Sequence, residues 1–320
     1  MRIYVLALND VFDTGLSTLL DTFSTANELA ESAGTSSARF DVTVIGVRPR
    51  VRTSQGLSVP VRPAMRLARP DVVLVPALGS KMPETLRVTL QRRDIIDTHV
   101  LLRRWSDSGA LVGAACTGTF VLAGTSLLDG QRATTSWWLA PFFRERYPHV
   151  VLDDSHMLVG SSRFVTAGAA LAHLDLALWL VRRRSPALAA LTARYLVVDP
   201  RPSQAAFAIP DHLAHSDPLV ERFERWARRQ LADGFSLSEA ARAALTSERT
   251  LARRLQSVLG KSPLAFFQDI RVERAVHLLQ TTTASVDQIA DQVGYADGVT
   301  LRTLIRRKLG RGVRELRARN

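Results

Sequence analysis

The sequence predicts an α/β domain followed by an all-α domain with two helix-turn-helix units. Three observations support this prediction. Strand-like and helix-like segments alternate in the first part of the chain, every segment after Leu219 has helical spacing, and the second part contains an internal repeat. We therefore expect an N-terminal domain at residues 1–198, a linker at 199–218 and a C-terminal domain at 219–320.

The N-terminal part has short apolar runs typical of strands, separated by helical segments. The expected strands are Arg2–Leu8, Phe40–Val47, Asp71–Ala77 and Ala110–Ala115, and the expected helices are Thr14–Gly34, Asp94–Asp107, Thr117–Leu128 and Gly168–Leu180. This alternation predicts a mainly parallel sheet sandwiched by helices, which is a flavodoxin-like arrangement.

The only cysteine of the chain, Cys116, lies in a tight turn of small residues between an expected strand and an expected helix. Such a turn lies at the carboxyl end of a parallel sheet, where α/β folds bind ligands, and Pro76–Gly79 is expected at the same edge. Backbone N–H groups at the turn are expected to attract carboxylate or other anionic groups. A single cysteine excludes an internal disulfide and a cysteine-based zinc site.

The second part begins after Asp199–Pro218, a segment with four prolines and no clear period, which predicts the linker. Beyond it, Ser236–Gly260 and Ser285–Gly310 share one pattern at an offset of 49–50 residues. Each copy has a capping box, a short helix, a turn and a longer helix, which is typical of a helix-turn-helix unit. The boxes pair Ser236 with Glu239 and Ser285 with Gln288.

The longer helix of each copy has an apolar face and an arginine-bearing face. The apolar residues are Leu251, Leu255 and Leu259 in the first copy, and Leu301, Ile305 and Leu309 in the second. The residues expected to meet DNA are Arg249, Thr250, Arg253 and Arg254 in the first copy, and Val299, Thr300, Arg302 and Arg306 in the second. Arg254 is expected to contact the phosphate backbone. A helix over Ser262–Gln280 is expected to hold the two longer helices in successive major grooves, about 34 Å apart. An all-helical interaction module is the alternative.

The net charge of +12 comes from 42 basic and 30 acidic side chains, and only three of the basic residues are lysines. Residues 1–200 contribute +5 and the shorter remainder contributes +7. A dense basic end indicates a polyanionic partner, although an arginine bias also follows from genome composition. No apolar run approaches the roughly 20 residues that span a bilayer, and the first residues have the pattern of a strand rather than a signal peptide.

Ser236–Arg317 resembles the AraC/XylS-type DNA-binding domain. The motifs that carry the resemblance are Ser262-Pro263, Arg271–Leu279, Ile289-Ala290 and Val293–Asp297. The chain departs from the usual pattern in three ways. Leu301 and Ile305 replace phenylalanines, the usual proline after the last recognition helix is missing, and Gly298 is small where other members often read a base. The resemblance implies that the second copy contacts the DNA backbone more than the bases.

Arg2–Val198 resembles the PfpI-like domain of the class I glutamine amidotransferase-like superfamily, and with the AraC-type domain the chain resembles the GlxA family of transcriptional regulators. The motifs are Asp13–Gly15, Ala115–Phe120, Leu127–Gly130, Arg132–Trp137 and Thr166–Gly168. In enzymes of the superfamily, a cysteine in the turn between a strand and a helix is paired with a histidine, often near an acid. The histidine is needed because a base must generate the thiolate. Relatives commonly carry histidine where this chain has Ser136, which cannot act as a general base.

The resemblance therefore implies a transcriptional regulator without catalytic residues. A small-molecule ligand is expected to contact Asp13, Cys116, Thr117, Ser136 and Trp137. Cys116 as a small core residue is one alternative. The other is a cysteine-dependent hydrolase or amidotransferase-like enzyme with an appended DNA-binding module, whose base would be His99, His149, His156 or His173; for His173 a half-buried structural role is expected instead.

The expected partners are double-stranded DNA, a small-molecule effector, RNA polymerase and a second copy of the chain bound through the N-terminal domain. We expect no cofactor, no metal and no membrane contact, and a cytoplasmic location, which the single cysteine favours.

Overall fold

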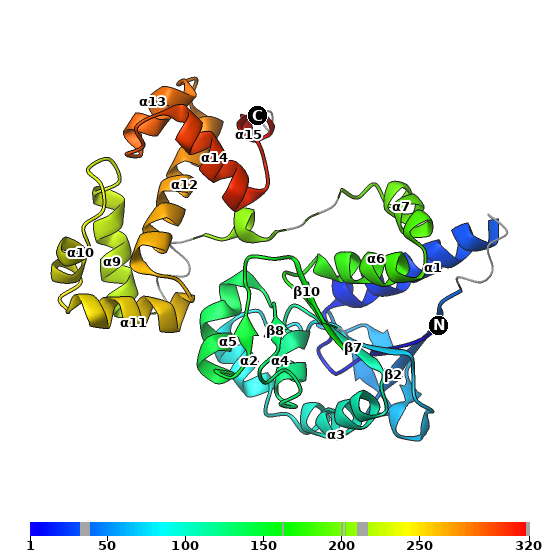
Figure 1. Cartoon of the computed structure of the whole chain (residues 1–320). Coiled ribbons are helices and arrows are strands. Elements are labelled where there is room, and N and C mark those ends of the chain that lie inside the picture. Colours follow the sequence, from blue (N-terminus) through cyan, green and yellow to red (C-terminus); the bar gives the residue numbers. More distant parts are fainter. Residues whose placement is uncertain (33–38, 162, 200, 202, 210–216, 318–320) are drawn as a thin grey trace. The chain divides into compact units, whose positions relative to one another are not determined.

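The computed structural model describes residues 1–320 except 33–38, 162, 200, 202, 210–216 and 318–320 (Figure 1). The chain forms two compact units, one of Met1–Leu139 with Arg146–Gln204 and the other of Ala140–Glu145 with Ala205–Asn320. The predicted linker at 199–218 lies partly outside the described residues. Among the described residues, no helix is long and apolar enough to cross a membrane.

The first unit contains a seven-stranded sheet in the order β10-β11-β7-β6-β1-β2-β5. These strands are β1 Arg2–Leu6, β2 Asp41–Gly46, β5 Arg62–Pro63, β6 Val72–Val75, β7 Leu111–Ala115, β10 Leu158–Gly160 and β11 Phe164–Ala167. All neighbouring pairs are parallel except β10 with β11. The four predicted strands are confirmed as β1, β2, β6 and β7, whereas β5, β10 and β11 were not predicted.

Helices cover both faces of this sheet (Figure 1). The helices are α1 Asp13–Ser32, α2 Pro83–Thr89, α3 Arg93–Asp107, α4 Gly118–Ala123, α6 Ala172–Arg184 and α7 Pro186–Tyr195. Helices α1, α6 and α7 pack on one another and share a core with the strands, in which Val5, Leu19, Phe23 and Leu176 are fully buried. The predicted α/β sandwich is therefore confirmed.

The helix that follows Cys116 is shorter than predicted. It ends at Ala123 instead of Leu128, and Ser126 has a positive φ of 63°, which cannot continue a right-handed helix. Several short elements complete the part between α4 and α6: β8 Arg132–Ala133, α5 Ala140–Arg146 and β9 Val151–Leu152. The pair β3 Val51–Arg52 and β4 Ser58–Val59 forms a small ribbon after β2.

The second unit is helical and confirms the predicted repeat. Its main helices are α9 Pro218–Arg229, α10 Leu237–Ala243, α11 Glu248–Leu259, α12 Pro263–Thr281, α13 Val286–Gln292, α14 Gly298–Leu309 and α15 Val313–Arg317. The pairs α10–α11 and α13–α14 are the two copies. Gly260 and Gly310 end the longer helices with φ of 66° and 68°, so the shared glycine has the same left-handed capping role in each.

The caps of the two shorter helices differ in one respect. Ser285 and Gln288 form the complete predicted box, in which each side chain bonds to the other residue's backbone N–H. Ser236 accepts from Glu239 N at 3.4 Å, but within the described residues the return bond from the Glu239 side chain is not formed. The predicted box is therefore complete only in the second copy.

Candidate functional site

The turn between β7 and α4 places Cys116 at the carboxyl end of the sheet. Cys116 has a positive backbone φ of 55°, which residues other than glycine rarely adopt. Gly118 allows the turn to approach β6 closely, because a Cβ at this position would lie 2.3 Å from Val75 O. The Thr117 hydroxyl then holds the turn in place, since it bonds to both Leu78 N and Leu78 O. We call Ala115–Gly118 the elbow.

The backbone N–H groups of the elbow are partly used within the protein. Cys116 N donates to Ala167 O at 2.9 Å, and Thr119 N donates to Cys116 O at 3.2 Å. The expectation that the N–H groups of this turn are free to bind an anion is therefore wrong for these two residues.

Ser136 is the hydrogen-bond partner of the Cys116 thiol. The Sγ–Oγ distance is 2.8 Å, both residues are buried, and the neighbouring Thr135 hydroxyl donates to Cys116 O at 2.7 Å. Burial raises the pKa of the Cys116 thiol, and the opposing effects of Ser136, Thr117 and Lys81 are smaller. The thiol is therefore uncharged at neutral pH, and the arrangement supplies no thiolate nucleophile.

Within the described residues, none of the four histidines of this unit is bonded to Cys116. His173 is fully buried, rather than half-buried as predicted: its Nε2 accepts from Ala77 N at 3.0 Å and its Nδ1 donates to Ala170 O at 2.6 Å. The bond that Nε2 accepts requires the neutral ring, and burial lowers the pKa of His173 to about 4 despite the opposing bond to Ala170. Gly15 provides the space, because a Cβ there would lie 2.6 Å from Nε2. The structure therefore gives His173 a structural role.

Asp13 begins α1 and is bonded to a loop rather than to the elbow. Its Oδ2 accepts from Ser54 Oγ at 2.8 Å and from Gln55 N at 3.1 Å. Burial opposes ionisation, but these bonds and one from Thr53 outweigh it and lower the pKa of Asp13. Its Oδ1 is buried and has no hydrogen-bond partner among the described residues.

Of the five predicted ligand residues, the structure therefore brings Cys116, Thr117 and Ser136 together. Trp137 follows Ser136 directly and is half-buried, with its ring centroid 5.7 Å from that of Trp138. Trp138 Nε1 donates to Lys81 O at 2.9 Å, which ties this segment to the loop after β6.

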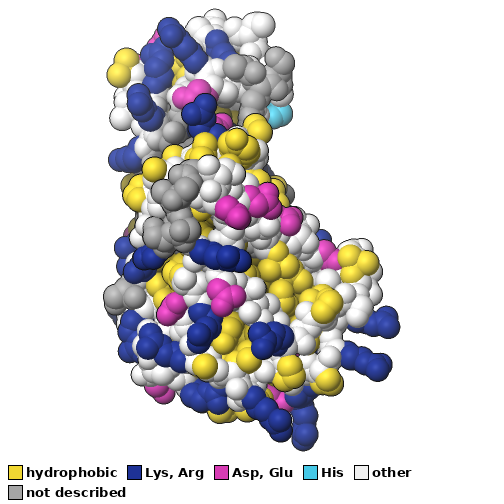
Figure 2. Space-filling model, turned by 90° about the vertical axis from the view of Figure 1, so that its right-hand side faces the viewer, with side chains coloured by type: hydrophobic (Ala, Val, Ile, Leu, Met, Phe, Trp, Pro, Cys, Tyr) yellow, Lys and Arg dark blue, Asp and Glu magenta, His cyan; other side chains and the backbone are white. Residues whose placement is uncertain are grey.

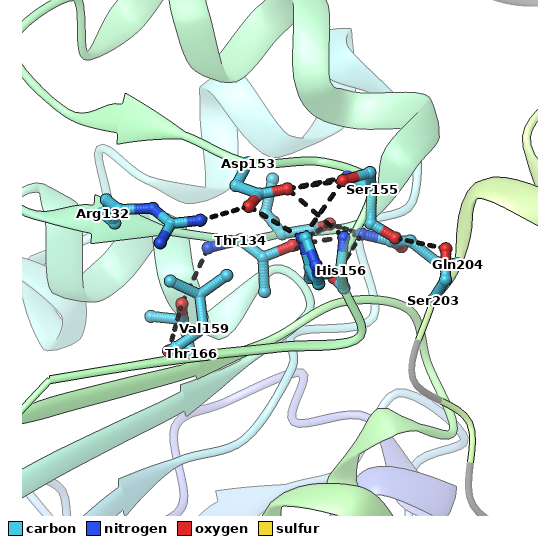
Figure 3. Close-up of polar contacts among 10 residues, drawn as sticks. Arg132, Thr134, Asp153, Ser155, His156, Val159, Thr166, Ser203 and Gln204 are labelled. Atoms are coloured by element: carbon cyan, nitrogen blue, oxygen red, sulfur yellow. Dashed lines mark hydrogen bonds and ion pairs between the residues drawn. The ribbon is translucent and has the colours of Figure 1, made fainter. Parts of the chain in front are cut away.

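A polar network lies beside the elbow and was not predicted from the sequence (Figure 3). Asp153 accepts from Arg132, Ser155 and His156, and these bonds outweigh the effect of burial and hold the pKa of Asp153 well below its ordinary value. The Ser155, His156 and Asp153 side chains do not form a catalytic triad, because the hydroxyl and the carboxylate both reach the same nitrogen, Nδ1.

Gln204 joins this network from the end of the first unit. Its side chain is fully buried, and its Nε2 donates to Thr135 O at 2.8 Å and to Thr134 Oγ1 at 3.1 Å. Its backbone N donates to Ser155 O at 2.9 Å, and Ser203 Oγ donates to the same carbonyl. Its Oε1 lies against Gly168, where a Cβ would come within 2.7 Å. The Thr134–Ser136 segment is therefore bonded to Cys116 through one set of atoms and to Gln204 through another.

The predicted DNA-facing residues of the second unit lie on α11 and α14. The side chains of Arg249, Arg253, Arg302, Arg306, Val299 and Thr300 are exposed, whereas Leu251, Leu255, Leu301 and Ile305 are fully buried. Thr250 and Thr300, which are 50 residues apart, occupy equivalent places, since each bonds to the residue that caps its helix, Ser247 or Asp297. Lys and Arg side chains are spread over the face drawn in Figure 2, consistent with the positive charge of both halves.

Two of the second unit's residues have internal roles that the sequence did not reveal. Arg254 pairs with Asp217, the residue that caps α9, at 2.5 Å, so its guanidinium is engaged within the unit. Gly298 is small because Asp287 lies against it: a Cβ would come within 2.6 Å of Asp287 Oδ1, which accepts from Gly298 N. The missing side chain at this position is therefore a packing requirement.

Arg271 connects the turn of the second helix-turn-helix copy to the loop between α9 and α10. It extends from α12 and donates through Nε and Nη2 to Leu231 O, in the loop before α10. Its guanidinium also stacks 5.1 Å from the ring centroid of Tyr295, in the turn of the second copy. Gly294 leaves room for it, with φ of 78° and a would-be Cβ 2.3 Å from Nη2. This buried side chain therefore fixes the turn of the second copy against the loop that precedes the first.

Family models match both units. The DJ-1/PfpI family matches residues 1–183, and a helix-turn-helix domain matches residues 240–319. The HTH-type transcriptional regulator ArgR of Pseudomonas aeruginosa is 30% identical over 201 residues, covering 62% of this chain and 61% of ArgR. The HTH-type transcriptional regulator GlxA of Rhizobium meliloti is 28% identical over 237 residues, covering 71% of each chain. The chain thus spans about three fifths of the length of ArgR.

Among solved structures, an AraC family transcriptional regulator from Pseudomonas putida superposes with a TM-score of 0.51 at 20% identity. The match covers 61% of this chain and 98% of that one. At this identity the likeness establishes the fold of the matched region.

The raised pKa of Cys116 predicts a distinctive pH profile of thiol labelling. Reaction with iodoacetamide should be slow at pH 7 and should increase only above the ordinary range of a thiol, about 8.5. Ser136→Ala should move the profile to still higher pH, because Ser136 lowers the pKa. Labelling followed by mass spectrometry, with Cys116→Ala as the blank, tests this. A midpoint below pH 8 would contradict the assignment of an uncharged thiol.

The buried neutral His173 predicts a loss of stability in mild acid. Its folded pKa of about 4 lies below the unfolded value of about 6.5, so the unfolded state binds the proton first. The first unit should therefore be fully stabilised above pH 6.5 and lose up to about 3 kcal/mol as the pH falls to 4. The ring signals of His173 in NMR spectra should keep their neutral shifts down to about pH 5. Titration of these signals near pH 6.5 would show that the ring is not held neutral.

Proposed function

The chain belongs to the DJ-1/PfpI family, and from this membership and its helical unit we propose that it is a sequence-specific DNA-binding transcriptional regulator. The observation that carries the proposal is the pair of capped helix-turn-helix copies, each with a buried apolar face and exposed arginines. ArgR and GlxA, which are described as transcriptional regulators, support it. We propose that residues 219–320 bind double-stranded DNA, that 199–218 form the linker and that 1–198 form a homodimer. The protein would act in the cytoplasm and influence RNA polymerase.

We propose further that the DJ-1/PfpI unit binds a small molecule near the elbow instead of catalysing a reaction. Two features support this proposal. Ser136 occupies the hydrogen-bonding position next to the thiol, where it cannot act as a base, and burial keeps the thiol uncharged. Asp13 Oδ1 is a buried acceptor without a hydrogen-bond partner among the described residues, which a ligand donor would satisfy. The enzyme alternative gains no support from this geometry.

A ligand at the elbow can change the DNA-binding unit only through a physical connection, and we propose that this connection leaves the first unit at Gln204. The Thr134–Ser136 segment bonds to Cys116 through Thr135 Oγ1 and Ser136 Oγ, and to Gln204 through Thr135 O and Thr134 Oγ1. The first unit ends at Gln204. A ligand that displaces this segment therefore removes the acceptors that hold the end of the unit.

The proposed DNA contacts predict different effects for neighbouring arginines. Arg249→Ala and Arg253→Ala should each cost roughly 1–3 kcal/mol of binding and relax sequence preference if they contact bases. Arg254 is half exposed even though it pairs with Asp217, so Arg254→Ala should weaken all duplexes alike. It should also lower the thermal stability, because Asp217 loses its ion-pair partner. Affinity should be measured on duplexes selected from genomic fragments and on random duplexes, with the exposed Arg229→Ala as a matched control. Unchanged binding by both Arg249→Ala and Arg253→Ala would refute the assignment of α11 as a recognition helix.

The proposed connection predicts that Gln204 controls access to Cys116. Gln204→Leu keeps the size of the side chain but removes the bonds that Nε2 donates to Thr134, Thr135 and His156. The Thr134–Ser136 segment should therefore loosen, and native-state labelling of Cys116 should accelerate several-fold. Ser203→Ala removes a bond to Ser155 O from the adjacent residue and should leave the rate unchanged. Equal Cys116 labelling rates in the wild type and Gln204→Leu would rule out this connection, independently of whether the protein binds DNA.

A further inference from the structure

Asp269 attaches both recognition helices to α12. This residue lies in the middle of α12, and its two carboxylate oxygens bind different lysines. Oδ2 is 2.8 Å from Lys261 Nζ, and Oδ1 contacts Lys308 Nζ. Lys308 lies in the last turn of α14, and Lys261 directly follows Gly260, which ends α11. One carboxylate therefore joins the carboxyl-terminal ends of α11 and α14.

The use of lysine at this place is selective. The chain has 39 arginines and three lysines, and two of the three lysines bind Asp269. An ammonium is a compact charge that can bind a single oxygen, whereas a guanidinium fork favours both oxygens of one carboxylate. Two ammonium groups can therefore share one aspartate where two guanidinium groups would compete for it.

The two lysines do not come from the repeat itself. At the 50-residue offset, Lys261 corresponds to Arg311 and Lys308 corresponds to Val258. Lys308 thus belongs to the second copy, whereas Lys261 is the residue that follows the first copy, and the two meet because of the three-dimensional arrangement. Asp269 is 19% exposed, and Lys261 and Lys308 are 31% and 20% exposed, so these charges are screened less than surface pairs are. Lys308 is further held by Ala265 O, at 3.5 Å.

We propose that Asp269 is a positioning residue that sets the separation of the two recognition helices, and so the spacing of the two DNA segments that one protomer accepts. It also withholds two lysine charges from phosphate. The inference rests on the proposed function, since it concerns how the helix-turn-helix pair selects its site.

Asp269→Asn should produce two changes of opposite direction in the full-length protein. Binding to random duplex should strengthen several-fold, because the lysines are released. The slope of log affinity against log salt concentration should steepen by the equivalent of about one to two additional phosphate contacts. Binding to a selected two-part duplex should weaken several-fold. The penalty for inserting one base pair between the two parts should become smaller, because the helix separation is no longer fixed.

Asp233→Asn is the matched control, because it removes the same charge from an exposed position of the same unit. It should strengthen binding to both duplexes alike and leave the insertion penalty unchanged. Asp269→Glu keeps the charge and should retain the weak random-duplex binding of the wild type. Thermal unfolding of each variant shows whether the fold is kept.

An Asp269→Asn protein with wild-type insertion penalty and wild-type affinity for random duplex would overturn the inference while leaving the proposed function intact. A wild-type protein that binds selected and random duplexes equally would overturn the proposed function, and the role assigned to Asp269 with it.

Discussion

The arrangement of the first unit depends on the close approach of the β7–α4 turn to the end of β6. Gly118 permits that approach, and neighbouring side chains form hydrogen bonds that hold it. Thr117 bonds to Leu78 on the β6 side, and His173 bonds to Ala77 beside it. The strain of the positive φ of Cys116 is offset because these bonds and the burial of the turn determine the conformation. The carboxyl edge of the sheet is therefore a rigid polar frame.

The second unit depends in a comparable way on α12. This helix carries the apolar residues that pack against both copies, including the fully buried Phe266, Ile270 and Ala275. Polar groups on the same helix add specific contacts. Arg271 bonds to the loop between α9 and α10 and stacks on Tyr295 of the second copy, and Glu273 pairs with Arg228 of α9. Apolar packing alone tolerates sliding, whereas ion pairs and hydrogen bonds specify one register. The helix between the copies is thus more than a spacer.

Local patterns predicted the elements well, because they depend on residues close in sequence. Local sequence predicts the buried runs of β6 and β7, the serine caps and the duplicated glycines. The Gln204 network was not, since Gln204 and Thr134 are 70 residues apart and neither has a distinctive neighbourhood. The Asp269 bridge was not predicted either, because Lys308 is 39 residues away along the chain and no local pattern pairs Lys261 with Asp269. Gly298 was noticed as unusual, but only the structure shows that Asp287 occupies the space.

The elbow also shows that a nucleophile's geometry and its reactivity have separate causes. The strained turn, Gly118 and the Thr117 bonds orient the Cys116 side chain whether or not the sulfur reacts. Reactivity requires a thiolate, and this depends on a neighbouring base or positive charge outweighing burial. Ser136 fills the neighbouring position without supplying either, so burial dominates. Because the frame does not depend on the identity of that one side chain, a DJ-1/PfpI unit can keep its fold while the reactivity of its cysteine changes.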